Sequence, residues 1–306
     1  MDDPRADSRV LTTRRRLAGI LAGAAGLGVV ASMSPRARAQ ATPGVFVPDT
    51  PTATPVIASP ADTSAPTVIT LYSEIDEKTL PFGELEHVAT VLNTQLTRDF
   101  APVWGRTAVV TAVPLKTPLP SQWWLEVQES PTQGSIGHVS SHPNGSGPWA
   151  IVPHLPATGW SREASHECLE MIVNPYNNAY YVMPSFCPRQ NDVLYSVEVC
   201  DPVSTEAQAY VIDGLLVSDF VTPRYFDPDP AAIAGVKYSF RGNADGPLGM
   251  AIAKSRTKAS GGYAVAPGGY QNWQTLDEKE HWRATRQDWG LQLCQPHDDG
   301  TELCGC

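Results

Sequence analysis

Three side chains in the segment "ASHECLEMIVNP", Ala164 to Pro175, have the types and the spacing to hold and use a metal ion: His166, Glu167 and Glu170. On an α-helix, positions i and i+4 lie on one face about one turn apart, so the His166 imidazole and the Glu170 carboxylate can reach the same ion. Glu167, one position further round, would lie where a general base takes a proton from an attacking water. The pattern predicts a divalent metal site, with Zn²⁺ as the expected ion.

The same segment, Ala164 to Pro175, also fits an ordinary amphipathic helix. Leu169, Ile172 and Val173 would then form a buried stripe, and the His and Glu side chains would point to water. A carboxylate at position 170, where many metallopeptidases have a second His, binds zinc at nearly the distance of an imidazole nitrogen but makes the ion a poorer Lewis acid. The motif alone leaves both interpretations open.

The elements before this helix are expected to be mainly strands. β-branched and aromatic runs predict the strands, apolar residues spaced by three and four predict one helix, and Asn144-Gly145 predicts a hairpin turn. Ser161 is the expected cap of the helix that carries His166, and Asn174-Pro175 is its expected end. The expected elements are strands at Thr67 to Ile75, Thr107 to Val113 and Trp123 to Glu129, a helix over Leu85 to Phe100, and a hairpin of Gly134 to Ser141 with Pro148 to His154.

This order of elements, from Thr67 to Pro175, resembles the N-terminal half of the zincin metallopeptidases. The resemblance implies an α+β fold with a mixed, mostly antiparallel sheet and an active-site helix. It also implies an edge strand, just before that helix, that lies antiparallel to the bound peptide. Gly137 to Val139 is the candidate edge strand. His138 on it could orient the substrate or reach the metal, or be a surface residue.

A longer likeness rests on "SHECLEMIVNP", "YSVEVCDPV" and "VSDFVTP". These stretches resemble an uncharacterised family of bacterial and phage proteins, over most of Gly134 to Phe226. A "GGY" at Tyr263 or Tyr270 extends the likeness, and Asn174 stands where the family has Asp. Gluzincin peptidases take their third ligand from a Glu twenty or more residues past the helix, which implies Glu198.

Asp201 is the alternative third ligand, next to a Pro that restricts its backbone. Both carboxylates also have structural interpretations, because Glu198 could pair with an Arg and Asp201-Pro202 could form a turn. Candidate donors to an oxyanion are tyrosines, and the sequence does not rank them. They are Tyr180, Tyr181, Tyr210 and Tyr225.

The six Cys of the chain all lie in its second half. An even number in an exported chain predicts oxidised cysteines, with up to three disulfides, and Cys168 is expected in one of them. The tail from about 290 to 306 is expected to be stapled by Cys294 with Cys304 or Cys306. The alternative there is a zinc knuckle with His297.

The ends of the chain predict export. Residues 1–39 start Arg-rich, continue with a mildly apolar run and end in small residues, and "TRRRLAG" with Arg14 and Arg15 resembles a twin-arginine signal. An uncleaved membrane anchor is the alternative, although Leu17 to Ser32 is short for a span. Residues 40–66 are rich in Pro, Thr and Ala, which predicts an extended linker or stalk, and the folded domain is expected over 67–306.

Charge excludes one class of partner. Residues 1–39 hold seven Arg and three Asp, so their removal changes the net charge from -10 to -14. Such an acidic protein has no basic stripe with which to bind nucleic acid.

Three functions agree with these features. The first is a secreted or otherwise exported metallopeptidase without a membrane span in its mature form, in which His166, Glu170 and Glu198 or Asp201 hold the metal, Glu167 activates water, and a peptide or protein is the substrate. The second is an inactive zincin-like module that binds a partner at the cell surface or on a virion. The third is a domain that binds Ca²⁺ for stability alone.

Overall fold

The computed structural model describes residues 67–114, 123–129, 137–139, 147–155, 159–258, 263–287, 290–296 and 302–304. All of them belong to one unit of the chain, Thr50–Cys306. The expected export signal, the linker and the Asn144-Gly145 turn lie outside the described residues. Among the described residues, no helix combines the length and the apolar composition that crossing a membrane requires.

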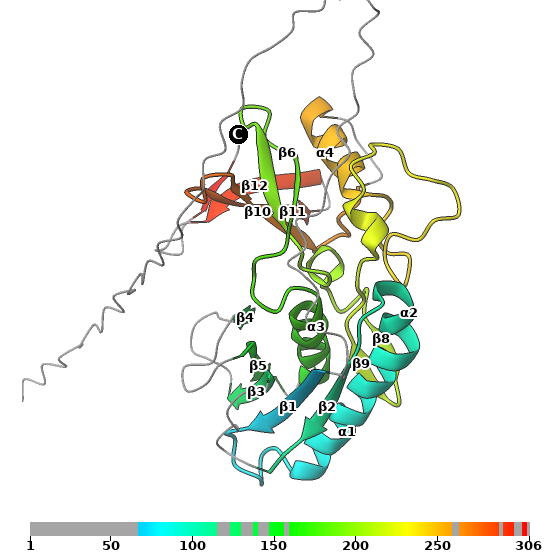
Figure 1. Ribbon diagram of the computed structural model, residues 1–306, viewed down its shortest axis with the longest axis vertical. Helices are drawn as coiled ribbons and strands as arrows, with labels where there is room; N and C mark the ends of the chain where they lie inside the picture. The colour runs from blue at the N-terminus through cyan, green and yellow to red at the C-terminus, as the bar shows by residue number, and fades with distance from the viewer. Residues whose placement is uncertain are drawn as a thin grey trace, which may run out of the picture. The chain divides into compact units, whose positions relative to one another are not determined.

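The first half of the described chain forms a five-stranded sheet in the order β2-β1-β3-β5-β4 (Figure 1). Three neighbouring pairs are parallel, and β4 lies antiparallel to β5 at one edge. The predicted strands are therefore confirmed, and the expected edge strand lies at an edge. The strands are β1 Thr67–Ser73, β2 Ala108–Ala112, β3 Trp123–Glu129, β4 Gly137–Val139 and β5 Trp149–His154.

Two helical segments pack on this sheet because alternate strand residues and one face of each helix are apolar. Leu71 pairs with Leu125, and Leu125 pairs with Ala150, so these three side chains form a buried row on one face of the sheet. They share one core with both helical segments. The first segment runs through α1 Phe82–Thr94, the π-helical η1 Gln95–Phe100 and α2 Ala101–Trp104, and the second is α3 Trp160–Val173.

Helix α3 begins differently from the prediction. Its first residue is Trp160, and Gly159 occupies the cap position with a φ of 71°, a left-handed conformation that favours glycine. Ser161 lies inside the helix, and its hydroxyl donates to the Leu216 carbonyl instead of capping. The prediction that Ser161 caps the helix is therefore wrong, because its hydroxyl bonds to a residue that is distant in the sequence.

The other end of α3 is held by Arg106. Asn174 ends the helix as predicted, and the Arg106 guanidinium donates to the carbonyls of Ile172 (3.2 Å) and Val173 (2.9 Å). A cation at this end satisfies carbonyls that lack helical partners and complements the helix dipole.

Replacing Arg106 by Ala is expected to lower the free energy of unfolding by about 1–2 kcal/mol, because two carbonyl acceptors lose their charged donor. Urea denaturation of the variant and the wild type measures the difference. Arg224→Ala is the control, since Arg224 is exposed and its 3.9 Å pair with Asp227 is expected to contribute less than about 1 kcal/mol. Equal losses in the two variants would contradict the capping role.

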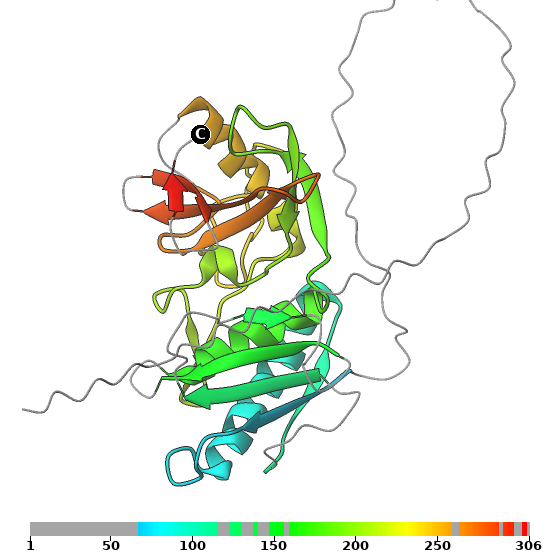
Figure 2. The ribbon, with the colours of Figure 1, turned by 90° about the vertical axis from the view of Figure 1, so that its left-hand side faces the viewer.

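The second half of the described chain adds a six-stranded antiparallel sheet in the order β13-β12-β11-β10-β7-β6 and a two-stranded sheet, β8-β9. The orange and red strands in Figure 2 belong to the larger sheet. The predicted α+β class is confirmed. The sheet that packs on α3 is mixed, as expected, but it is mostly parallel, and most antiparallel pairs lie in the other two sheets. The strands are β6 Tyr180–Pro184, β7 Asp192–Ser196, β8 Tyr210–Ile212, β9 Leu215–Val217, β10 Tyr270–Thr275, β11 His281–Gln287, β12 Gly290–Pro296 and β13 Glu302–Cys304.

Short helices connect these strands. They are the 3-10 helices η2 Asp201–Val203 and η3 Pro223–Phe226, and the α-helix α4 Leu248–Thr257. Pro202 in η2 and Pro223 in η3 stand at the start of their helices, where a missing N–H has no cost.

The cysteines are only partly oxidised. Cys168 and Cys200 are buried and free, whereas Cys187 is disulfide-bonded. The expectation that Cys168 is in a disulfide is therefore wrong, because it faces the core between the sheet and α3. Cys294 and Cys304 occupy opposite positions on β12 and β13. The side chains of Cys294, Cys304 and Cys306 lie outside what the structure describes.

Candidate metal centre

Helix α3 buries the side chains that the amphipathic alternative would have exposed. His166 is 6% exposed, Glu167 is 2% exposed and Glu170 is 4% exposed. Burying charged groups costs free energy unless they are paired or bind an ion. The alternative of a helix that turns these three residues to solvent is therefore wrong.

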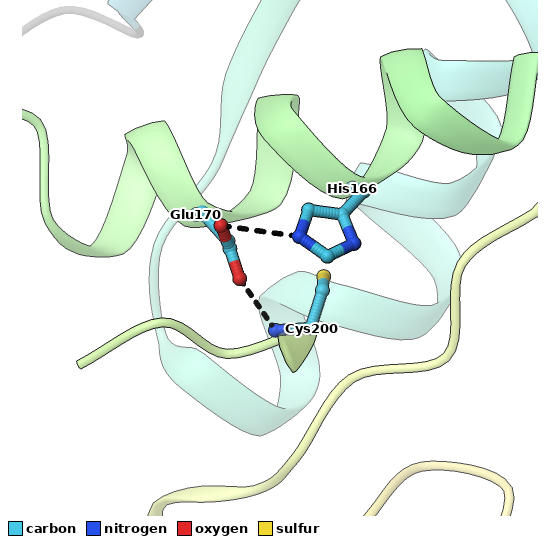
Figure 3. Close-up of side chains that lie close together, drawn as sticks. All are labelled: His166, Glu170 and Cys200. Atoms are coloured by element: carbon cyan, nitrogen blue, oxygen red, sulfur yellow. Dashed lines mark hydrogen bonds and ion pairs between the residues drawn. The ribbon is translucent and has the colours of Figure 1, made fainter. Parts of the chain in front are cut away.

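A short turn brings a second segment to the helix. Glu170 Oε1 accepts hydrogen bonds from the backbone N–H groups of Cys200 (3.0 Å) and Asp201 (3.2 Å). These bonds join the last turn of α3 to the start of η2 and the residue before it, as Figure 3 shows for Glu170 and Cys200. The "EVCDPV" stretch therefore contributes to the centre through a 3-10 turn.

His166 faces two carboxylates with the same nitrogen. Its Nε2 lies 3.3 Å from Glu170 Oε2 and 3.2 Å from Asp201 Oδ1. A hydrogen bond between charged groups of this kind is shorter, about 2.7–2.9 Å. Two ligands bound to one tetrahedral zinc ion are instead about 3.3 Å apart, because each lies about 2.0–2.1 Å from the ion. Each spacing alone fits a pair of ligands on one ion, but Asp201 does not belong to the set of ligand atoms that lie within 4.8 Å of one another.

Cys200 offers a further ligand on another side of the imidazole. Among the described residues, one group of three side chains places its ligand atoms within 4.8 Å of one another: His166, Glu170 and Cys200 (Figure 3). Such a buried group can hold a metal ion. Asp201 is outside this group although it lies beside His166, so Glu170 and Asp201 approach Nε2 from different directions.

Glu198, the favoured third ligand in the sequence, lies in the wall of the same pocket. Its Oε1 accepts hydrogen bonds from Asn174 Nδ2 (3.2 Å) and Ser196 Oγ (3.0 Å). Asn174 also accepts from the backbone of Asn178 and Ala179, which holds the turn after α3. Of the two candidate third ligands, Asp201 is the one that the structure places beside His166.

The pocket in front of these residues has a volume of about 400 Å³. Glu167 lines it together with His166, Glu170 and Asp201, whereas Cys200 does not. The other lining residues come from α3, the segments around η2, and strands β10 and β11, and they are Arg162, Glu163, Asn177, Glu198, Ser204, Tyr270, Asn272 and Arg283.

Strand β10 reaches the pocket through the second "GGY" of the chain. A side chain at Gly269 would put its Cβ 2.3 Å from the Pro202 carbonyl oxygen, so only glycine lets the start of β10 lie against η2. Tyr270, the next residue, therefore lines the pocket near Asp201. No catalytic role for Tyr270 was predicted from the sequence, in which the double glycine before it was the signal.

The acidic surroundings shift several pKa values. Burial alone would lower the pKa of His166, but the charge of Glu170 and the close contacts of Nε2 with Asp201 and Glu170 raise it well above its usual value. Burial and the Asp201 charge raise the pKa of Glu170. The Asp201 charge, together with burial, also raises the pKa of Tyr270, so its phenol keeps its proton.

The four tyrosines singled out in the sequence lie elsewhere. None of them lines this pocket: Tyr180 lines a neighbouring one, Tyr181 stacks on Phe226, and Tyr210 and Tyr225 are buried with hydrogen bonds to Asp99 and Gln271. His138 belongs to β4, but its side chain lies outside what the structure describes.

The buried thiols of Cys168 and Cys200 are poor nucleophiles. Burial raises the pKa of Cys168 to about 12 and that of Cys200 well above its usual value, so neither is a thiolate near neutral pH. A cysteine nucleophile does not fit either position.

Comparisons of the chain with protein-family models, with curated proteins and with solved structures find no match.

Proposed function

We propose that this chain is a metal-dependent peptidase. His166, Glu170 and Asp201 would hold a divalent ion at the inner end of the pocket, and Glu167 would be the general base. The burial of three carboxylates around one imidazole carries the proposal: Glu167, Glu170 and Asp201 are 2%, 4% and 3% exposed. Without a cation these groups repel one another; burial first, and then the Asp201 charge, raises the pKa of Glu170.

The donor set favours zinc over calcium. Calcium takes six to eight oxygen ligands, whereas imidazole nitrogen suits zinc and related transition metals. Here the imidazole Nε2 lies between the two carboxylates. A site built around this nitrogen supports a zinc-type ion and argues against a calcium site for stability.

Asp201 is preferred to Cys200 and Glu198 as the third ligand for two reasons. Its Oδ1 lies 3.2 Å from Nε2, and its side chain lines the pocket, so an ion held there keeps a face open to substrate. Cys200 is fully buried and does not line the pocket. An ion bound to Cys200 would lie away from the pocket and could not contact the substrate there.

The residues around the ion have separate tasks in the reaction. When bound, the ion would supply Lewis-acid polarisation and make water acidic. Glu167, beside His166 on the pocket side of α3, would accept the proton of the attacking water and pass it to the leaving amine. Tyr270 keeps its phenolic proton and bonds to Asp201, so it would orient that ligand.

A peptide substrate is supported by the edge of the five-stranded sheet. Strand β4 is the last strand of that sheet among the described residues, and it packs against α3. An extended peptide can add to such an edge through backbone hydrogen bonds. This arrangement agrees with the zincin resemblance, in which the edge strand before the active helix runs antiparallel to the peptide, and the presence of Glu167 in the pocket favours a catalyst over an inactive binding module. The Arg14-Arg15 signal supports action outside the cytoplasm.

Metal analysis of the purified full chain tests the proposal. We expect about one zinc or similar transition-metal ion per chain, cleavage of a mixed peptide library detected by mass spectrometry, and loss of cleavage after treatment with a chelator. Re-addition of Zn²⁺ is expected to restore cleavage, while Ca²⁺ is not. A chain that binds no metal and cleaves no peptide even with added Zn²⁺ would contradict the proposal.

A further inference from the structure

Two arginines line the pocket, and one of them is already engaged. The terminal nitrogens of Arg162 donate to the Ser204 carbonyl oxygen and to the Glu163 carboxylate. Its charge is thereby offset within the wall of the pocket. Arg162 therefore already has a carboxylate partner.

Arg283 differs because no described carboxylate pairs with it. Its Nε donates to Asn272 Oδ1 (3.0 Å), and its guanidinium carbon lies 4.5 Å from the centre of the Tyr270 ring. These contacts fix the plane of the guanidinium but leave both terminal nitrogens without a partner among the described residues. Arg283 is half-buried and lines the pocket, so these nitrogens can reach a ligand there.

One side chain separates Arg283 from the proposed metal ligand. Asn272 accepts from Arg283 through Oδ1, and its Nδ2 donates to Asp201 Oδ2 (3.4 Å). Asp201 in turn lies beside His166. A group held by Arg283 would therefore lie in the same pocket as Asp201, with Asn272 between the two residues.

A planar guanidinium with two free terminal nitrogens matches a carboxylate, which it binds through two parallel hydrogen bonds. Elsewhere the pocket wall is acidic and would repel an anion. We propose that Arg283 binds the free α-carboxylate of the substrate, so that the enzyme removes the carboxyl-terminal residue of a peptide. This inference rests on the proposed peptidase function and specifies its substrate.

The reaction is a simple hydrolysis. Water adds its hydroxyl group to the carbonyl carbon of the last peptide bond, the C–N bond breaks, and the leaving amine takes the proton. The products are a free amino acid and a peptide shortened by one residue.

A second pocket, of about 280 Å³, provides space for the side chain of the departing residue. Arg283 and Asn272 line both pockets, so a carboxylate on Arg283 places the adjoining side chain at the entrance of the second one. Tyr180, Leu194 and Trp282 contribute apolar surface there. An aromatic terminal residue is therefore expected to fit.

Binding and cleavage of a matched pair of peptides test the inference. The probes are N-acetylated Ala-Ala-Phe with a free terminal carboxylate and the same peptide as its carboxamide. Equilibrium binding is measured with zinc-loaded Glu167→Gln protein, which removes turnover from the measurement. We expect the free acid to bind about 10- to 100-fold more tightly than the amide, and Arg283→Gln in the same background to abolish that preference. In the wild type, mass spectrometry is expected to detect release of Phe from the free acid.

Arg224→Gln is the control for loss of one positive charge, because Arg224 is exposed and does not line the pocket; it should keep the preference. Equal binding of the two peptides, binding of neither, or an equal loss for both in Arg283→Gln would overturn the inference. Efficient cleavage of amidated peptides would also overturn it while leaving the peptidase proposal intact. Failure of the peptidase proposal is separate, since it appears as absence of metal and of all cleavage.

Discussion

Replacing Glu167 by Gln is expected to lower kcat for peptide hydrolysis by about 100- to 10,000-fold, the range typical for loss of a general base. Glutamine keeps the shape of the side chain but cannot accept the proton of the attacking water. The metal content should stay unchanged, because Glu167 is not among the proposed ligands. Kinetic assays with a peptide substrate measure kcat, and metal analysis of the same preparation measures the metal content.

Glu163→Gln is the matched comparison, since it removes the same charge from the same helix and the same pocket. The Glu163 carboxylate pairs with Arg162, so this variant should lose far less activity than Glu167→Gln. Thermal melting by circular dichroism verifies that both variants fold. Comparable losses in the two variants, or loss of metal from Glu167→Gln, would contradict the role of Glu167 as base.

Asp201→Asn is expected to weaken zinc binding by more than about 100-fold. Substitution of groups that merely orient ligands costs about 10- to 100-fold, and loss of a charged ligand should exceed that. The amide keeps the volume of the carboxylate, so the effect should not arise from unfolding. Competition with a metal-sensing chelator measures the dissociation constants.

Glu198→Gln and Cys200→Ser complete this experiment, because each alters one of the other candidate ligands. Both variants are expected to bind zinc nearly as tightly as the wild type. If Glu198→Gln instead loses the metal, the ligand set implied by the gluzincin resemblance is correct. If Cys200→Ser loses it, the buried group of His166, Glu170 and Cys200 is the metal site.

Local features of this chain could be predicted from its sequence where short-range rules apply. The strands and the helix over Leu85 to Phe100 follow from hydrophobic periodicity, and the positions of His166 and Glu170 on one face follow from helical geometry. The order of elements also predicted that the strand Gly137–Val139 lies at an edge of its sheet, where the structure places it.

Features that depend on tertiary partners could not be predicted. Glu198 and Asp201 are three residues apart, and only the 3-10 turn of η2 decides which of them reaches His166. Ser161 is of a residue type that often caps helices, but its hydroxyl donates to the carbonyl of Leu216, which is distant in the sequence. Arg283 and Tyr270 come from another sheet, far along the chain, and no spacing rule connects them to α3.

The two oxygens of Glu170 have different partners, and this limits how the residue can bind a metal. Oε1 is held by the N–H groups of Cys200 and Asp201, so only Oε2 faces His166. In the proposed site Glu170 would therefore be a monodentate ligand, since a bidentate mode would break two backbone hydrogen bonds. Calcium sites commonly rely on bidentate carboxylates to reach their high coordination number. The denticity fixed by the η2 backbone thus keeps the coordination number low, as a zinc ion with a vacant position for substrate requires.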